Sequence, residues 1–215
     1  MHTYIREPIN GLTHLVGALL SFIALLAMTI KASVHTPSFL AITSVIIFGI
    51  SLILLYSASA TYHMVIAKDN VIAFLRRVDH SMIYVLIAGT YTPYCLITLN
   101  GTVGWVLFGL ITILAIFGVL FKLIWFHCPR WLSTSLYIAM GWVVIFFSSP
   151  LSASLHTNGL LLLILGGVLY TIGGIIYGVK PKCLSFKHWG YHEIFHIFIL
   201  LGSLSHFLSI FLYVI

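Results

Sequence analysis

Two histidines four residues apart stand out near the end of this 215-residue chain. They bound the segment HEIFH at residues 192–196, so His192 and His196 share one face of a helix and both imidazoles can reach one ion. A third imidazole, His63, ends the segment SATYH at residues 59–63, with Ser59 one turn before it on the same face. Three neutral imidazoles on Zn²⁺ leave a fourth position for water, whose pKa then falls toward 7. The sequence therefore predicts a zinc site built from His63, His192 and His196.

Acidic side chains are scarce, which makes their positions informative. The chain has four, and Asp79 directly opens an apolar run after Arg76 and Arg77. A carboxylate at this position could orient a metal-bound water or take its proton. The alternative is that these histidines and Asp79 are buried packing groups, hydrogen-bonded to neighbouring helices.

A polar face also precedes the first apolar run. Glu7, Asn10 and His14 are spaced i, i+3 and i+7, so they share a face if the helix begins by Glu7. Two interpretations stay open: these side chains support the zinc site or close its mouth, or they form a polar helix start that anchors at the membrane interface.

The elements that must position these groups are membrane spans. The chain is 61% hydrophobic and 7% charged, with a mean hydropathy of +1.14, which indicates a multi-pass protein of the cell membrane. Seven apolar runs are long enough to cross about 30 Å of hydrocarbon, and such runs satisfy their backbone in lipid as helices. We predict an all-α fold in which residues 1–215 form a single domain of seven transmembrane helices, at residues 12–30, 39–63, 79–99, 103–124, 132–149, 160–179 and 191–215.

Basic residues predict the orientation. With the N-terminus cytoplasmic and the C-terminus outside, only Lys31 lies on the outer side. The cytoplasmic side then carries the other nine: Arg6, Lys68, Arg76, Arg77, Lys122, Arg130, Lys180, Lys182 and Lys187. This topology brings His63, Asp79, His192 and His196 within roughly two turns of the cytoplasmic face. The net charge of +6 thus reflects topology; membrane lipids are the expected partners, nucleic acid is not, and no protein partner is identifiable.

Several other residues receive structural interpretations. His80 points about 100° away from Asp79, and His206 lies about 15 Å deeper than His196, so neither is expected to bind the same ion. His206 is expected to be a packing or cavity residue. Gly174 and Gly178 have the GxxxG spacing of close helix packing. The tryptophans mostly lie near span ends, as in an aromatic belt: Trp105, Trp125, Trp131, Trp142 and Trp189. The three cysteines have no CxxC spacing: Cys95, Cys128 and Cys183.

The segment 192–196 also reads as H-E-x-x-H, the motif in which a metalloprotease uses the glutamate as general base. We find no second aspartate motif of the Leu-Asp-Gly type that intramembrane metalloproteases use for their third ligand. The pattern with Ser59, His63 and Asp79 supplies the missing groups instead. Glu193 stays open as an auxiliary base beside Asp79.

Three segments together resemble a known family. EPINGLTH at residues 7–14, SATYH at residues 59–63 with Asp79 following, and HEIFH at residues 192–196 match in order the signatures of the progestin and adipoQ receptor family, and most resemble its bacterial hemolysin III branch. The resemblance extends from Glu7 through the last span and includes Thr92-Pro93.

The resemblance implies a seven-helix protein with a zinc ion on the cytoplasmic side. Zinc would be held by His63, His192 and His196, while Asp79 and Ser59 would position the zinc-bound water. The wider superfamily includes alkaline ceramidases, which implies hydrolysis of a lipid amide. The long N-terminal domain of the adiponectin receptors has no counterpart here, so an extracellular hormone ligand is not implied.

Three functions are consistent with these patterns. The first is zinc-dependent hydrolysis of a lipid amide or a related acyl bond. The second is cytolytic or pore-forming activity, as the hemolysin name suggests, although a pore needs a continuous polar lining and the polar groups here crowd one face. The third is a membrane-lipid sensor or regulator in which zinc ties two spans together.

Overall fold

The computed structural model describes residues 4–125, 127–184, 186 and 189–215, and every regular element in this part of the chain is helical. Seven helices are long and apolar enough to cross a membrane, which confirms the all-α, multi-pass prediction. In chain order the elements are α1 (Pro8–His35), α2 (Phe39–Met64), α3 (Asp69–Pro93) with the π-helical turn η1 (Tyr94–Leu99), α4 (Gly101–Ile124), α5 (Arg130–Gly141) with the 3-10 segment η2 (Trp142–Phe147) and α6 (Ser148–Ser154), α7 (Thr157–Val179), the 3-10 turn η3 (Lys182–Leu184) and α8 (Tyr191–Tyr213).

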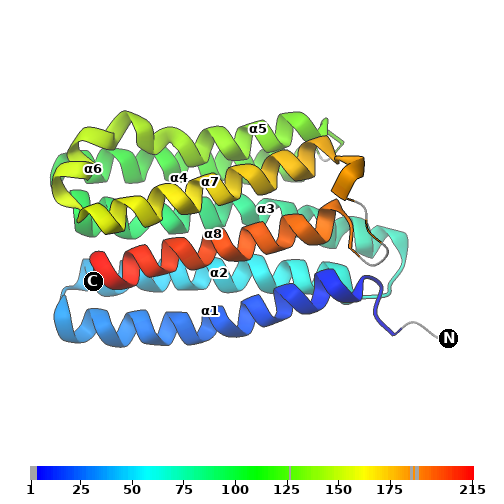
Figure 1. Ribbon diagram of the computed structural model, residues 1–215, viewed down its shortest axis with the longest axis horizontal. Coiled ribbons are helices and arrows are strands. Elements are labelled where there is room, and N and C mark those ends of the chain that lie inside the picture. Colours follow the sequence, from blue (N-terminus) through cyan, green and yellow to red (C-terminus); the bar gives the residue numbers. More distant parts are fainter. Residues whose placement is uncertain (1–3, 126, 185, 187–188) are drawn as a thin grey trace.

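The spans lie side by side along the long axis of the molecule, and the described N- and C-terminal segments lie at opposite ends (Figure 1). α2 packs between α1 and α3, and α8 packs against α7 and α1. We call the end at which α1 begins the N-terminal face, and the other end the distal face. Lys31 lies toward the distal face, where its ammonium contacts Phe211. Lys187 of the predicted cytoplasmic set lies outside the described residues, and which face is cytoplasmic stays a prediction.

Several helices begin earlier than predicted, and the largest differences are at α1 and α3. α1 begins at Pro8 rather than residue 12, and α3 begins at Asp69 rather than Asp79. The added turns of α3 contain the charged residues Asp69, Arg76 and Arg77. Asp79 therefore lies almost three turns inside a helix that was predicted to begin with it. The fifth span also extends further, from Arg130 to Ser154.

Buried aromatic and aliphatic side chains, mainly of α1 and α2, form one core cluster, in which Met28, Phe48 and Tyr56 are almost fully buried. A second cluster lies among α3, α4 and α5. Many outward-facing side chains are also apolar, as expected for helices in contact with lipid. Small residues allow close helix contacts. A Cβ at Gly174 would lie 3.3 Å from Ile138 of α5, which agrees with the predicted packing role, whereas Gly178 has only ordinary contacts.

Candidate metal centre

Three histidines from two helices meet near the N-terminal face. His63 lies in the last turn of α2, and His192 and His196 lie in the first two turns of α8. One nitrogen from each imidazole lies within 4.8 Å of the other two, and His63 Nε2 is 3.3 Å from His192 Nε2. His63 and His196 are each 1% exposed. The structure thus brings together the three predicted metal ligands.

The separation of the first two nitrogens suits a shared ion. Two nitrogen ligands at the usual zinc distances in a tetrahedral site lie about 3.3 Å apart. In addition, the buried Nδ1 of His196 has no partner with good hydrogen-bond geometry among the described residues. Buried imidazole nitrogens without hydrogen bonds are costly, so the cluster fits the donor set of a transition-metal ion.

Glu7 orients His63 from the chain segment that precedes α1. The Glu7 amide donates to the His63 carbonyl at 2.9 Å, and the Arg6 guanidinium donates to the Tyr62 carbonyl at 2.6 Å. Both carbonyls belong to the last turn of α2, where helical partners are lacking. The Glu7 carboxylate in turn lies 2.6 Å from His63 Nδ1. This contact favours the tautomer with hydrogen on Nδ1, which leaves the lone pair of Nε2 free for a metal.

The carboxylate of Glu7 is ionised at neutral pH. The hydrogen bond with His63 lowers the pKa of Glu7 to about 2, and the neighbouring Arg6 guanidinium acts in the same direction. An anionic partner on Nδ1 makes the opposite nitrogen a stronger donor to a cation.

Asn10 and His14 complete a polar face of α1 that is turned toward α8. The His14 ring stacks on the His196 ring with centroids 3.6 Å apart, and the Asn10 amide donates to Glu193 Oε1 at 2.9 Å. Together with Glu7, which contacts His63, these side chains line the histidine cluster on the side of α1. The geometry therefore favours support of the histidine cluster over the interfacial-anchor interpretation.

Glu193 is engaged through both of its oxygens. Oε2 accepts a hydrogen bond from the Gly190 amide at 2.8 Å, which caps the N-terminus of α8, and Oε1 accepts from Asn10. Glu193 is also absent from the cavity described next. These contacts assign it to capping and bridging, and oppose its interpretation as an auxiliary base.

A cavity of about 610 Å³ begins beside the histidines. Ser59, Asp79, His192 and His196 line its first part, and the Ser59 hydroxyl is a hydrogen-bonding partner of the Asp79 carboxylate. The cavity then continues between mainly apolar and aromatic side chains to Leu99 and to Leu160 of α7 near the distal face. This shape suits a long hydrocarbon chain with a polar group at the histidine end.

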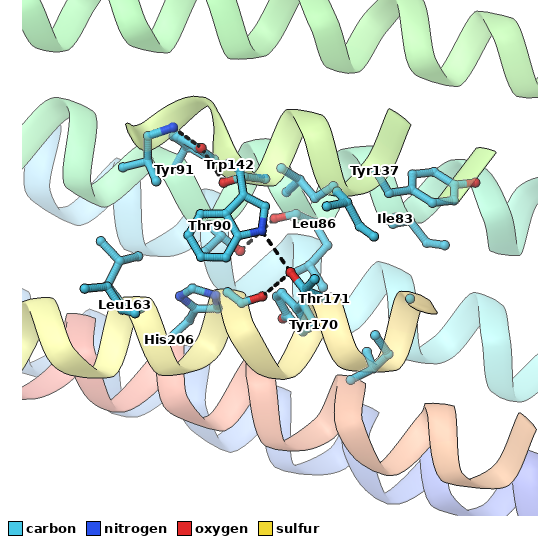
Figure 2. A pocket seen from close by; sticks show the side chains of 18 of the residues that line it. Ile83, Leu86, Thr90, Tyr91, Tyr137, Trp142, Leu163, Tyr170, Thr171 and His206 are labelled. Atoms are coloured by element: carbon cyan, nitrogen blue, oxygen red, sulfur yellow. Dashed lines mark hydrogen bonds between the residues drawn. The ribbon is translucent and has the colours of Figure 1, made fainter. Parts of the chain in front are cut away.

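Figure 2 shows the middle of the cavity, where η2 faces α7. The Trp142 indole donates to the Thr171 hydroxyl at 2.9 Å, and His206 is another residue that lines the cavity. Tyr91 donates to the Gly141 carbonyl at 2.7 Å and accepts from the Val144 amide at 2.9 Å, which holds the 3-10 segment in place. Trp142 is thus a cavity residue rather than part of an aromatic belt.

Comparison with known proteins identifies the family of the chain. A model described as haemolysin-III related matches residues 2–207 of the chain. The chain belongs to this family. It is 40% identical to Hemolysin-3 of Bacillus cereus, over 100% of this chain and 95% of that protein, and 41% identical to the Hemolysin-3 homolog of Bacillus subtilis (strain 168), over 99% and 96%. It is also similar to the human Monocyte to macrophage differentiation factor, with 25% identity over 78% of this chain and 68% of that protein.

In this haemolysin-III-related chain, the residues singled out from sequence separate into two groups. The histidine cluster, its support from α1 and the Ser59–Asp79 pair lie together. His80 is not one of the three clustered histidines, as expected, and its ring lies between the Arg76 carbonyl and the Tyr177 hydroxyl. It does not point away from Asp79 as predicted, because His80 Nδ1 lies 3.5 Å from Asp79 Oδ2. Sequence reasoning missed Tyr91, Thr171 and Tyr177, since a tyrosine or threonine inside an apolar run gives no signal of facing a cavity.

Proposed function

We propose that this chain is a zinc-dependent membrane hydrolase that acts on a lipid amide or a related acyl bond. The observation that carries the proposal is the position of the histidine cluster at one end of a long apolar cavity, beside the partly buried carboxylate of Asp79. His63, His192 and His196 would hold the ion. When bound, zinc supplies a Lewis acid that polarises a carbonyl and lowers the pKa of water toward 7.

The residues around this centre have separate tasks in the proposed reaction. The Asp79 carboxylate, with 16% of its side chain exposed, accepts a proton from the attacking water and returns it to the leaving amine or alcohol. Ser59 holds that carboxylate in place through its hydroxyl. The apolar wall of the cavity binds the hydrocarbon chain and excludes bulk water from the reacting bond.

The test is a search for lipid products with matched variants. Wild-type protein, Asp79→Asn and the double variant His192→Ala/His196→Ala are reconstituted in nanodiscs and incubated with a lipid extract. Asp69→Asn serves as the control, because this exposed carboxylate lies at the start of α3 and outside the cavity. We expect about one zinc per chain in wild type, Asp79→Asn and Asp69→Asn, and none in the double variant. New fatty acid should appear only with wild type and Asp69→Asn; product formation by Asp79→Asn, or a zinc-free wild type, contradicts the proposal.

The relatives named Hemolysin-3 support a second candidate, lysis of membranes. Dye release from liposomes separates the two. Release that persists in the double histidine variant, with no lipid turnover by wild type, favours lysis. Zinc binding that is required for folding, with neither turnover nor dye release, favours a lipid sensor with structural zinc.

A further inference from the structure

A second, smaller cavity lies among α3, α4, α5 and α7 at the N-terminal face, outside the histidine cluster. Its volume is about 30 Å³. Three cationic side chains line it, Arg76, Lys122 and Arg130, and no aspartate or glutamate of the described chain does. We call it the basic pocket.

Lys122 is the most unusual member of the basic pocket, because it is only 4% exposed. Its ammonium donates to the Ser133 hydroxyl and, at 3.5 Å, to the Cys128 sulfur, while Cys128 and Ser133 contact each other at 2.9 Å. Within the described residues, Lys122 forms no ion pair with a carboxylate. A buried ammonium that has only side chains without formal charge as partners is costly, since desolvation is not offset by an opposite charge.

The neighbouring cations increase this cost. Arg76 lies close enough to Lys122 for the two charges to repel each other. Arg130 lies over the Tyr177 ring, 5.9 Å from its centroid, and is exposed at the mouth of the pocket. Convergence of like charges around a void is stabilised most directly by an anion within it.

The surroundings of the mouth indicate where the anion comes from. Trp125 precedes the pocket residues Cys128 and Arg130 in the chain, and Trp131 follows them. The two tryptophans are 50% and 66% exposed, and Ile124, next to Trp125, is 83% exposed. Exposed tryptophans beside basic residues are typical of the level of lipid headgroups. Basic pockets between transmembrane helices recognise anionic headgroups.

We propose that the basic pocket binds a phosphate oxyanion that is presented by an anionic phospholipid headgroup. A cavity of this volume admits two or three oxygen atoms, since a single water needs about 10–15 Å³ by the same measure. The oxygens meet Lys122 and Ser133 inside, and the remainder of the phosphate lies at the mouth. There the planar guanidinium of Arg130 can form paired hydrogen bonds with it.

The basic pocket shares a wall with the large cavity. His80 and Tyr177 line both cavities, and His80 Nε2 lies 2.9 Å from the Tyr177 hydroxyl. A bound headgroup would therefore lie one layer of side chains away from the large cavity. The proposed lipid site does not depend on the metal or on any hydrolysis.

The test compares Lys122→Met and Arg130→Gln with wild type and with Lys182→Gln. Lys182 is a matched control because it is an exposed cation at the same face and outside the pocket. Purified full-length protein is titrated with phosphatidylglycerol or phosphatidylcholine in mixed micelles, and bound lipid is counted by native mass spectrometry. Wild type and Lys182→Gln should retain phosphatidylglycerol over phosphatidylcholine, and each pocket variant should bind it about tenfold more weakly, as expected for loss of a charged hydrogen bond.

Other outcomes overturn the proposal in distinct ways. Equal weakening in Lys182→Gln would mean general attraction to surface charge rather than a pocket. A rise in melting temperature with inorganic phosphate alone would assign the site to a soluble anion. If Lys122→Met does not fold, Arg130→Gln still tests the proposal, because Arg130 is exposed and its replacement should not prevent folding. Unchanged selectivity for phosphatidylglycerol in Arg130→Gln contradicts the proposal. Zinc content is measured in parallel and should be equal in all variants, which separates this site from the metal centre.

Discussion

The histidine cluster depends on how each imidazole is oriented. A histidine can present either nitrogen to an ion, and the hydrogen bond on the other nitrogen selects which one. Glu7 makes this selection for His63, and its own position is fixed by the backbone hydrogen bond to the same residue. The candidate site therefore depends on one carboxylate that binds no metal itself.

Glu7→Gln should weaken zinc binding by about 10–100-fold, the usual effect of removing the partner of a ligating histidine. The amide is neutral, so it no longer strengthens Nε2 of His63 as a donor. Competition with a fluorescent chelator measures the affinity. Asp69→Asn removes an equal charge from an exposed carboxylate that belongs neither to the cluster nor to the cavity lining, and it should bind zinc as wild type does; equal affinities for all three proteins would show that Glu7 does not support the site.

Glu193→Gln separates capping from catalysis. The carboxylate of Glu193 accepts hydrogen bonds from the Gly190 amide and from the Asn10 side chain. Glutamine has only one acceptor oxygen, because an NH2 group replaces the other, so one of these hydrogen bonds is lost. The loss should cost about 1 kcal/mol, or about 2–4 °C in melting temperature. Lipid turnover per folded molecule should match wild type, whereas Asp79→Asn should abolish turnover at an unchanged melting temperature. The opposite pattern would make Glu193 the base.

Residue spacing predicted the histidine cluster because His192 and His196 are neighbours on one helix and charge counting placed His63 at the same depth. Other contacts depend on how separate helices approach each other, and such contacts have no local pattern in the sequence from which they could be predicted. The stacking of His14 on His196 is one such contact, and the burial of Lys122, which the sequence indicates only as one of the cytoplasmic basic residues, is another.

At the scale of elements, hydropathy located all seven spans but not their ends. The first turns of α3 are helical although Arg76 and Arg77 make them too polar for an apolar run, because helical backbone continues beyond the hydrocarbon where water satisfies the side chains. The π-helical turn η1 had no sequence signal either. It follows Pro93 and carries the Cys95 carbonyl toward α4, where Gly104 leaves room for it.

Gly104→Ala tests this close approach. A Cβ at Gly104 would lie 2.0 Å from the Cys95 carbonyl oxygen, a backbone atom that cannot rotate away. We expect a loss of about 1–3 kcal/mol, the usual cost of overpacking, measured by unfolding in detergent. Gly109→Ala, on the same helix with nothing within 4 Å, should be neutral or more stable by up to about 1 kcal/mol. Equal effects of the two substitutions would contradict the packing described for η1.

At the scale of the whole molecule, most basic residues and the candidate metal centre lie at the same end. The link between α4 and α5, the link between α2 and α3, and the start of α8 meet at the N-terminal face, together with the histidine cluster and the basic pocket. Since basic residues favour the cytoplasmic side, this face is predicted to be cytoplasmic.

Reporter fusions test this orientation. Alkaline phosphatase, which folds only outside the cytoplasm, should be active when fused after Ile215 and inactive when fused in the link between α4 and α5. Green fluorescent protein should give the reverse pattern, with fluorescence from the link. An active phosphatase in the link would invert the molecule and place the histidine cluster on the outer side.

The distances along the chain between the residues of the histidine cluster have a consequence for synthesis. Glu7 and His63 are 56 residues apart and can meet once two helices have emerged, but His63 and His192 are 129 residues apart. At about 5–20 residues per second, roughly 6–26 s separate their translation. During that interval the first two helices hold an oriented imidazole with no partners from α8. If the candidate site binds an ion as proposed, capture is therefore expected only after α8 has emerged, and a chain stalled on the ribosome before α8 should not retain metal.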